Sequence, residues 1–509
     1  MNKRINQKRV GAILQYCQII LNILISLIYS PIMLRILGQN EYGIYSVASS
    51  TISFLSLLSL GLGGSYLRYY SIYKKDNDEE GISRLNGLYL FVFSVIGLIS
   101  LVLGLTLAFN VGLIFNESYS SSDINIARVL MIILSINLAI SFPASVFSSY
   151  ITSQEKFVFQ KIVNMLTTVL GPCTCIILLF CGFASIGMVV ASLLFTILTA
   201  VINIYYSVVK LKMRISYKKI DFRLLKDIFV FSLFIALNQI IEQINWQTDK
   251  IILGKMIGGS SVAIYAVGSQ INMLFVQFST AVSGVFAPRV NMIVQKNEKN
   301  MDEQLSDLFI LVGRIQWFVL FLILSGFAFF GKYFVYRWAG EGYDNSYYVA
   351  LLLMTPAIVA LIQNVGIEIQ RAKNKHQVRS IVYFAIAVLN VLISILFAML
   401  WGEIGCALGT TISLILGPIL FMNVYYQKKL NIDIKRFWKE IGKTLPGMVL
   451  PLIYGALILL FHKFASFVDF GILIVAYTAI YSLSVYMTSL NSTEKGYISS
   501  IIRFFSKNK

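Results

Sequence analysis

Charged side chains are scarce in this sequence of 509 residues, where Asp, Glu, Lys and Arg together make up only 13%. A soluble domain of ordinary composition carries about 25% charged residues. Half that supply cannot cover the surface of a water-soluble protein of this size, and 57% of the residues are apolar. A mean hydropathy of +0.75 agrees with a surface that faces lipid. The composition therefore excludes a soluble, fibrous or disordered protein.

Histidine and cysteine, the usual ligands of structural metals, are also rare. The sequence holds two histidines, His376 and His462, and they lie far apart. Among the five cysteines, Cys173 and Cys175 are two positions apart, so on a helix they point to different sides and cannot hold a metal together. We therefore expect no metal site and no His-based catalytic cluster.

Long apolar runs are what the sequence has in abundance. A transmembrane helix needs about 20 mostly apolar residues, and fourteen such runs can be laid along the chain. They are residues 11–34, 43–66, 85–109, 126–149, 159–181, 185–209, 227–250, 261–287, 307–331, 347–369, 380–400, 404–426, 444–462 and 467–490. The first run is longer than the core of a signal peptide and has no cleavage pattern after it. The sequence predicts an all-α polytopic membrane protein with little chain left for a globular domain.

The basic residues predict the orientation of these spans. If the N-terminus is cytoplasmic, 34 of the 42 Lys and Arg residues fall in cytoplasmic segments, as the positive-inside rule requires. An even number of spans then places both termini in the cytoplasm. The net charge of +18 therefore describes topology, and we expect no nucleic-acid partner.

The sequence also contains an internal repeat with an offset of about 218 residues. Residues 36–38 (ILG) and 44–49 (IYSVAS) recur at 252–254 (ILG) and 264–269 (IYAVGS). Shorter matches at nearly the same offset pair 162–163 with 381–382, 186–187 with 404–405, and 205–206 with 425–426. This offset equals six spans, so the two halves share one orientation, an arrangement typical of transporters that work by alternating access.

The repeat predicts three parts of the chain. They are an N-terminal six-helix lobe (1–222), a C-terminal six-helix lobe (223–430), and two additional transmembrane helices with a cytoplasmic tail (431–509).

Polar side chains follow one face of the predicted span 227–250. Asn238, Glu242, Asn245 and Asp249 are spaced i, i+4, i+7 and i+11, and Lys250 follows directly. Such groups at membrane depth usually face a cavity or another helix. Two interpretations stay open, namely a hydrated lumen that these residues line and a contact between the lobes in which they satisfy one another. We favour the lumen, where Asp249 and Lys250 pair with each other or with substrate.

Four further residues are candidates on the same grounds. Asn22 aligns with Asn238 at the repeat offset of 216, so we expect it to line the same cavity. Arg314 lies about seven residues inside its span, which leaves open an anion-binding role or a side chain that snorkels to the interface. Pro143 and Pro356 lie in corresponding spans of the two lobes and are either hinges or ordinary transmembrane prolines.

Several motifs resemble those of a known family. Residues 34–38 (LRILG), 41–46 (EYGIYS) and 60–63 (LGLG) resemble the opening of bacterial polysaccharide (O-antigen type) flippases. Residues 249–254 (DKIILG) resemble the start of their second lobe. These flippases belong to the multidrug/oligosaccharidyl-lipid/polysaccharide exporter superfamily, and the resemblance covers essentially the whole of both lobes.

The resemblance implies a flippase that moves undecaprenyl-diphosphate-linked oligosaccharide to the outer leaflet for cell-surface polysaccharide synthesis. Cationic cavity residues would meet the diphosphate. It implies no cofactor, although H⁺, Na⁺ or the membrane potential could drive transport. The implied partners are the lipid-linked substrate, membrane lipids, a polysaccharide polymerase and glycosyltransferases. Lipid II flippases carry several arginines in their first helices and span 11–34 has none, which favours the polysaccharide branch.

Three alternatives remain at this point. One is a cation-coupled multidrug exporter of the same fold, and another is a lipid II-type flippase. The third is a membrane enzyme that polymerises or ligates sugar repeats. The predicted non-cytoplasmic connections are only about 15 residues long, too short for the catalytic loop of such an enzyme, so we expect a protein that is not an enzyme.

Overall fold

The computed structural model describes residues 2–116, 119–217, 222–296, 298–375, 377–464, 466–492 and 494–496. His376 and the predicted tail after residue 496 lie outside this set. Helices make up the described chain, and no strand occurs in these ranges. An all-helical structure is what lipid demands, because each backbone amide and carbonyl in a helix is satisfied within its own segment.

In the described residues, the first half of the chain forms eight α-helices. They are α1 (Asn2–Phe54), α2 (Leu62–Lys75), α3 (Glu79–Phe109), α4 (Ser121–Ser153), α5 (Phe157–Phe180), α6 (Ala184–Tyr205), α7 (Phe222–Met256) and α8 (Gly259–Ser283).

The second half forms nine more. They are α9 (Ala287–Lys296), α10 (Met301–Ala339), α11 (Asp344–Ile362), α12 (Val365–Ala372), α13 (Gln377–Leu414), α14 (Met422–Lys429), α15 (Ile434–Gly442), α16 (Pro446–Phe461) and α17 (Phe467–Thr488).

Short polar side chains set several of the helix starts. At α4, the Ser120 hydroxyl accepts a hydrogen bond from the Asp123 amide, and the Asp123 carboxylate accepts one from the Ser120 amide. Asp78, Asp433 and Ser466 cap the starts of α3, α15 and α17 in a similar way. Such caps satisfy amides that the first helical turn leaves without partners.

Two glycines break helices that would otherwise be too long for a membrane. A straight helix of 53 residues would extend about 80 Å, against about 30 Å of hydrocarbon. Gly38 in α1 has a φ of 70°, and Gly402 in α13 has a φ of 58°. Residues with side chains rarely adopt this left-handed conformation, so glycine suits both breaks. Predicted spans 11–34 and 43–66 therefore lie on opposite sides of Gly38.

Ten helical segments in the described chain are long and apolar enough to cross a membrane, or up to twelve if each of two bent pairs forms one span. All fourteen predicted spans overlap these twelve segments, because Cys17–Lys75 and Gln377–Lys429 each overlap two of them. The polytopic all-α fold is therefore confirmed. The number fourteen and the internal repeat stay predictions.

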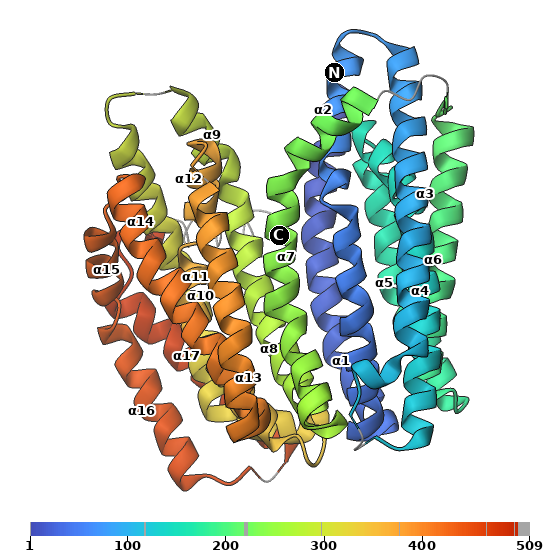
Figure 1. Cartoon of the computed structure of the whole chain (residues 1–509). Coiled ribbons are helices and arrows are strands. Elements are labelled where there is room, and N and C mark those ends of the chain that lie inside the picture. Colours follow the sequence, from blue (N-terminus) through green and yellow to red (C-terminus); the bar gives the residue numbers. More distant parts are fainter. Residues whose placement is uncertain are drawn as a thin grey trace. The chain divides into compact units, whose positions relative to one another are not determined.

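The described helices group into two compact units. The first comprises Met1–Val267 and Ser380–Thr410, and the second comprises Gly268–Arg379 and Thr411–Lys509. In the first unit α4 packs against both α3 and α6, beside the pair of α1 and α5 (Figure 1). In the second unit α16 and α17 pack on each other and on α10. The predicted division into lobes at residues 222 and 430 stays a prediction.

Each unit has its own aromatic core. In the first unit Tyr66 is fully buried and its ring packs against Tyr70 and Tyr89. In the second unit Tyr477 of α17 packs edge-on against Phe330 of α10. These cores fix the helices inside each unit, whereas many large apolar side chains elsewhere stay exposed, as lipid-facing residues do.

Candidate functional site

Asp249 lies in the most enclosed part of the polar face of α7. Its side chain is only 2% exposed. Tyr265 of α8 donates a hydrogen bond to Oδ2 of Asp249, and the Thr410 hydroxyl of α13 donates another at 2.8 Å. Behind Thr410, Asn390 donates to the Thr410 hydroxyl at 3.4 Å, and Ser394 donates to Asn390 at 3.3 Å. We name these five residues the Asp249 cluster.

The chemistry of the Asp249 cluster suits a proton or a monovalent cation. A carboxylate buried away from water is costly unless a proton, a cation or hydrogen-bond donors compensate its charge. The partners of Asp249 in the cluster are neutral hydroxyls, which donate hydrogen bonds but also offer oxygen lone pairs. The cluster can therefore hold a small cation among oxygen atoms or exchange a proton with an aqueous path.

Asp249 stands out in the sequence as a polar residue at membrane depth, but its partners do not. Tyr265 is 16 positions away and Thr410 is 161 positions away. Tyr265 does belong to the repeated motif at 264–269, which was the available signal. Nothing in the local pattern around Thr410 or Asn390 indicates a carboxylate beside them.

Lys250 faces away from the Asp249 partners, towards α1. Its amino group donates to Oε1 of Gln247 at 3.5 Å, and the Ser50 hydroxyl of α1 donates to the same oxygen at 2.8 Å. One turn earlier on α7, Gln243 donates to the Ser56 hydroxyl at 3.2 Å. Gln243 and Gln247 therefore take part in a contact between α7 and the segment 50–56.

The other predicted polar residues on this face of α7 are more exposed than Asp249. Asn238 is exposed and accepts a hydrogen bond from Ser380 of α13 at 3.3 Å. Glu242 is exposed and accepts one from the Trp246 indole at 2.7 Å. Asn245 on α7 and Asn22 on α1 are half-buried. Their role in lining a common cavity stays a prediction.

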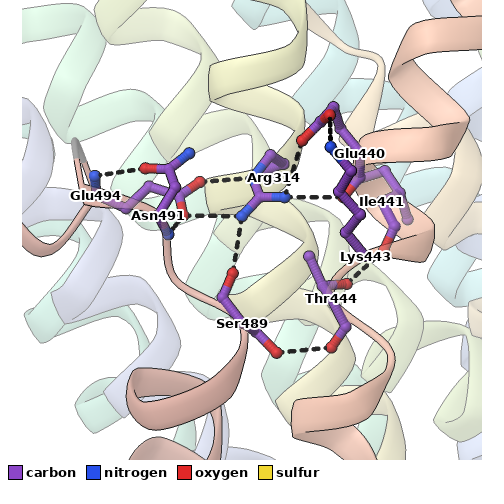
Figure 2. Close-up of polar contacts among 8 residues, drawn as sticks. All are labelled: Arg314, Glu440, Ile441, Lys443, Thr444, Ser489, Asn491 and Glu494. Carbon is purple, nitrogen blue, oxygen red and sulfur yellow. Dashed lines mark hydrogen bonds and ion pairs between the residues drawn. The ribbon is translucent and has the colours of Figure 1, made fainter.

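Arg314 of α10 is held by an ion-pair network in the second unit (Figure 2). Its guanidinium donates to both carboxylate oxygens of Glu494, at 2.7 and 2.9 Å. It also donates to the backbone carbonyls of Glu440 and Ser489, at 2.8 and 2.9 Å. The Glu440 carboxylate lies 3.6 Å from it, and both Arg314 and Glu494 are almost fully buried.

The Arg314 network joins three parts of the chain. It connects α10 to α15, which carries Glu440, and to the segment after α17, which carries Glu494. A two-point contact between guanidinium and carboxylate is strong and geometrically specific. An anion-binding role for Arg314 stays a prediction, and a phosphate at this position would compete with Glu494. The two acidic partners lie 126 and 180 positions away, and no local sequence pattern connects them to Arg314.

The two candidate hinge prolines lie inside continuous helices. Pro143 lies in α4, close to the line of contact with α3, where a Cβ on Gly97 would come within 3.6 Å of the proline ring. Pro356 lies buried in α11 and lines an apolar cavity of about 340 Å³ in the second unit. The hinge role of both residues stays a prediction.

The described residues contain no group of three or more His, Cys, Asp or Glu side chains that could hold a metal. Among the predicted residues, Asp249 and Arg314 are the buried charged ones in the described chain.

The chain is similar to a known family of proteins. Residues 32–347, more than half of the chain, match the family model described as "Polysaccharide biosynthesis protein". A putative O-antigen transporter of Shigella flexneri is 21% identical over 398 residues, which cover 77% of this chain and 91% of that protein. The uncharacterized membrane protein EpsK of Bacillus subtilis (strain 168) is 25% identical over 427 residues, covering 80% and 81%.

Solved structures share the fold. The lipid II flippase MurJ in an inward closed conformation aligns with a TM-score of 0.72 at 17% identity, over 94% of this chain and 98% of that one. An inward-facing multidrug resistance MATE transporter aligns with a TM-score of 0.61 at 16% identity, over 83% of this chain and 99% of that one. At these identities the likeness establishes the fold alone.

Proposed function

The chain belongs to the polysaccharide biosynthesis protein family, and from this we propose that it flips undecaprenyl-diphosphate-linked oligosaccharides across the bacterial cytoplasmic membrane. It is a multi-pass membrane transporter and not an enzyme. The lipid-linked units reach the outer leaflet, where they feed the synthesis of cell-surface polysaccharide. Both termini lie in the cytoplasm, as the distribution of basic residues predicts.

One observation carries this proposal. The family model matches residues 32–347, and the alignment with the putative O-antigen transporter covers 77% of this chain and 91% of that protein. A relationship of that extent concerns the whole transport unit and not a shared fragment. The fold adds support, because the structure that shares it is that of a lipid II flippase.

We propose that the Asp249 cluster couples transport to an ion gradient. Asp249 takes up a proton or Na⁺ in one conformation and releases it in the other, so that the gradient drives the cycle. Its burial among hydroxyl groups supports this role, since the free energy of a charged carboxylate there depends strongly on whether a cation accompanies it.

Glycosyltransferases that build the lipid-linked unit act before this step, and a polymerase that joins the units acts after it. We propose these enzymes as functional partners because the flippase consumes the product of the first and supplies the substrate of the second. Membrane lipids surround the apolar helices and carry the substrate.

Deletion of the gene tests the proposed function. We expect lipid-linked oligosaccharide to accumulate in the inner leaflet and surface polysaccharide to disappear, with recovery on plasmid-borne expression. The readout is the amount of lipid-linked sugar accessible to a membrane-impermeant glycosidase or lectin. If the deletion strain exposes as much lipid-linked sugar to the reagent as the wild type does, the proposal is wrong.

A cation-coupled drug exporter is the second candidate. A multidrug resistance MATE transporter has the same fold as this chain, and Asp249 is a buried carboxylate of the kind such pumps need. Drug accumulation in the same deletion and complemented strains separates the two. An exporter would change drug accumulation and leave surface polysaccharide intact.

A further inference from the structure

The first unit contains a second candidate site that none of the predicted residues touches. A cavity of about 560 Å³ lies among α1, α4, α5 and α6. Its volume falls within the range of about 300–1,000 Å³ that small-molecule sites occupy. We name it the α5–α6 cavity, because these two helices supply most of its wall.

The cavity extends along most of the length of a membrane span. On α5 the lining runs from Gln160 to Cys175, and on α6 from Met188 to Asn203. Fifteen residues of helix extend about 22 Å, compared with about 30 Å for the hydrocarbon core. The cavity is therefore an elongated track and not a pocket at one end of the bundle.

The lining is uncharged and mixes polar with apolar side chains. Twelve of the twenty lining residues in the described chain carry a hydroxyl or an amide, the other eight are apolar or small and include one phenylalanine, and every one of the twenty lacks a formal charge. Among the lining residues of α5 and α6 are Asn164, Thr196, Thr199, Asn203 and Phe195. Hydroxyls and amides both donate and accept hydrogen bonds, and polar groups at membrane depth usually face a hydrated path or a ligand.

Asn203 supplies independent evidence of a ligand at one end of the track. Its side chain is 6% exposed, and its carbonyl Oδ1 has no hydrogen-bond partner among the residues that the structure describes. A buried acceptor without a partner costs about 1–3 kcal/mol. By contrast, Gln160 at the same end bonds to the Ser148 hydroxyl at 2.6 Å and to Thr152 at 2.8 Å. A hydroxyl donor from a ligand would satisfy Asn203.

We propose that the α5–α6 cavity binds the neutral sugar portion of the lipid-linked substrate. Sugar hydroxyls complement a wall of hydroxyls and amides, and the Phe195 ring offers an apolar face on which a sugar ring can lie. A diphosphate would call for Arg or Lys, and a cationic drug for a carboxylate, neither of which lines this cavity. The assignment rests on the proposed flippase function and adds where the sugar is held.

Binding measurements on the purified full-length protein test the assignment. The probes are oligosaccharide released by mild acid from the lipid-linked fraction of the producing cells and, separately, undecaprenyl diphosphate without sugar. Asn203→Leu keeps the shape of the side chain and removes its hydrogen-bonding atoms. We expect it to raise the Kd for the oligosaccharide about fivefold to tenfold and to leave the Kd for undecaprenyl diphosphate unchanged.

Two further variants keep the result interpretable. Thr196→Phe narrows the cavity and should weaken oligosaccharide binding. Asn125→Leu makes the same chemical change as Asn203→Leu at an exposed position of α4 outside the cavity, and this variant should bind normally. Size-exclusion profiles in detergent report folding. Wild-type affinity for the oligosaccharide in both cavity variants, or no binding by the unaltered protein, would overturn the assignment.

Complementation of the deletion strain separates failure of this site from failure of the proposed function. If the chain is a flippase that holds sugar elsewhere, deletion stops export and both cavity variants restore it fully. If the chain is not a flippase, deletion leaves export unchanged.

Discussion

At the scale of single residues, the structure assigns different environments to neighbours in the sequence. Asp249 and Lys250 are adjacent, yet Asp249 bonds to α8 and α13 while Lys250 bonds towards the α1 side of α7. Adjacent helical positions differ by about 100° around the axis, so one helix can serve two partners. The polar face of α7 therefore contacts different helices on its two sides.

Asp249→Asn tests the role of the buried charge. Asparagine has nearly the same shape and still accepts hydrogen bonds from Tyr265 and Thr410, so we expect insertion and folding to persist. Without a titratable carboxylate, coupling to an ion gradient is lost, so the export rate should fall to the rate that the wild type shows without a gradient. The measurement is the initial rate of lipid-linked sugar export in membranes with an imposed gradient. Wild-type export that still responds to the gradient would exclude Asp249 as the coupling residue.

Arg314→Leu tests the ion-pair network of Figure 2. It leaves the Glu494 carboxylate buried without its counter-charge, so we expect destabilisation by about 3–5 kcal/mol. The apparent Tm of the purified protein reports this. Arg371→Leu is the control. It removes the surface ion pair with Glu368 and should lower the free energy of unfolding by less than about 1 kcal/mol.

A double variant shows why Arg314→Leu lowers the stability of the protein. If the unpaired carboxylate causes it, Arg314→Leu combined with Glu494→Leu will be more stable than the sum of the single changes predicts. Strict additivity would argue against the network. Loss of export in a variant that keeps its Tm would instead favour the anion-binding role.

At the scale of helices, close approach depends on particular glycines. In the first unit, a Cβ on Gly43 of α1 would lie 2.0 Å from the backbone oxygen of Gly259 in α8, and one on Gly254 of α7 would lie 2.5 Å from the Val47 side chain of α1. Small residues permit such backbone contact between membrane helices. The second part of α1 therefore packs almost directly on the backbones of α7 and α8.

Gly43→Val should push these helices apart. We expect the free energy of unfolding to fall by about 1–3 kcal/mol, because backbone atoms at the contact cannot move aside as a flexible side chain would. Gly63→Val is the matched control, since nothing lies within 4 Å of a Cβ there. Fluorescence-detected size-exclusion chromatography of both variants measures the folded fraction. A Gly43→Val protein as well folded as the control would contradict this packing.

At the scale of the whole molecule, topology is open to direct measurement. Single cysteines at Ser120 and Glu341, both exposed in loops predicted to be outside, should react with a membrane-impermeant thiol reagent on intact cells. Cysteines at Asp76 and Asn374, exposed on the predicted cytoplasmic side, should react only after permeabilisation. The background needs the exposed Cys17, Cys173 and Cys181 replaced. Labelling of all four positions from one side would refute the predicted orientation.

Much of the architecture was predictable because it depends on local properties of the chain. The apolar run at 85–109 ends where α3 ends, at Phe109, and the run at 467–490 lies over α17, Phe467–Thr488. An apolar stretch in lipid has one stable backbone solution, and it can be recognised without knowing what packs beside it. Family motifs at 34–46 and 249–254 could be recognised for the same reason.

The sequence by itself thus determined the class of protein, the positions of the helices and the presence of costly polar groups such as Asp249 and Arg314. Only the tertiary structure decided what those groups contact. Thr410 and Glu494 lie 161 and 180 positions away from them, and the uncharged track of α5 and α6 combines side chains from four helices. Helix formation is local, whereas the partner of a buried side chain depends on which distant helix packs against it.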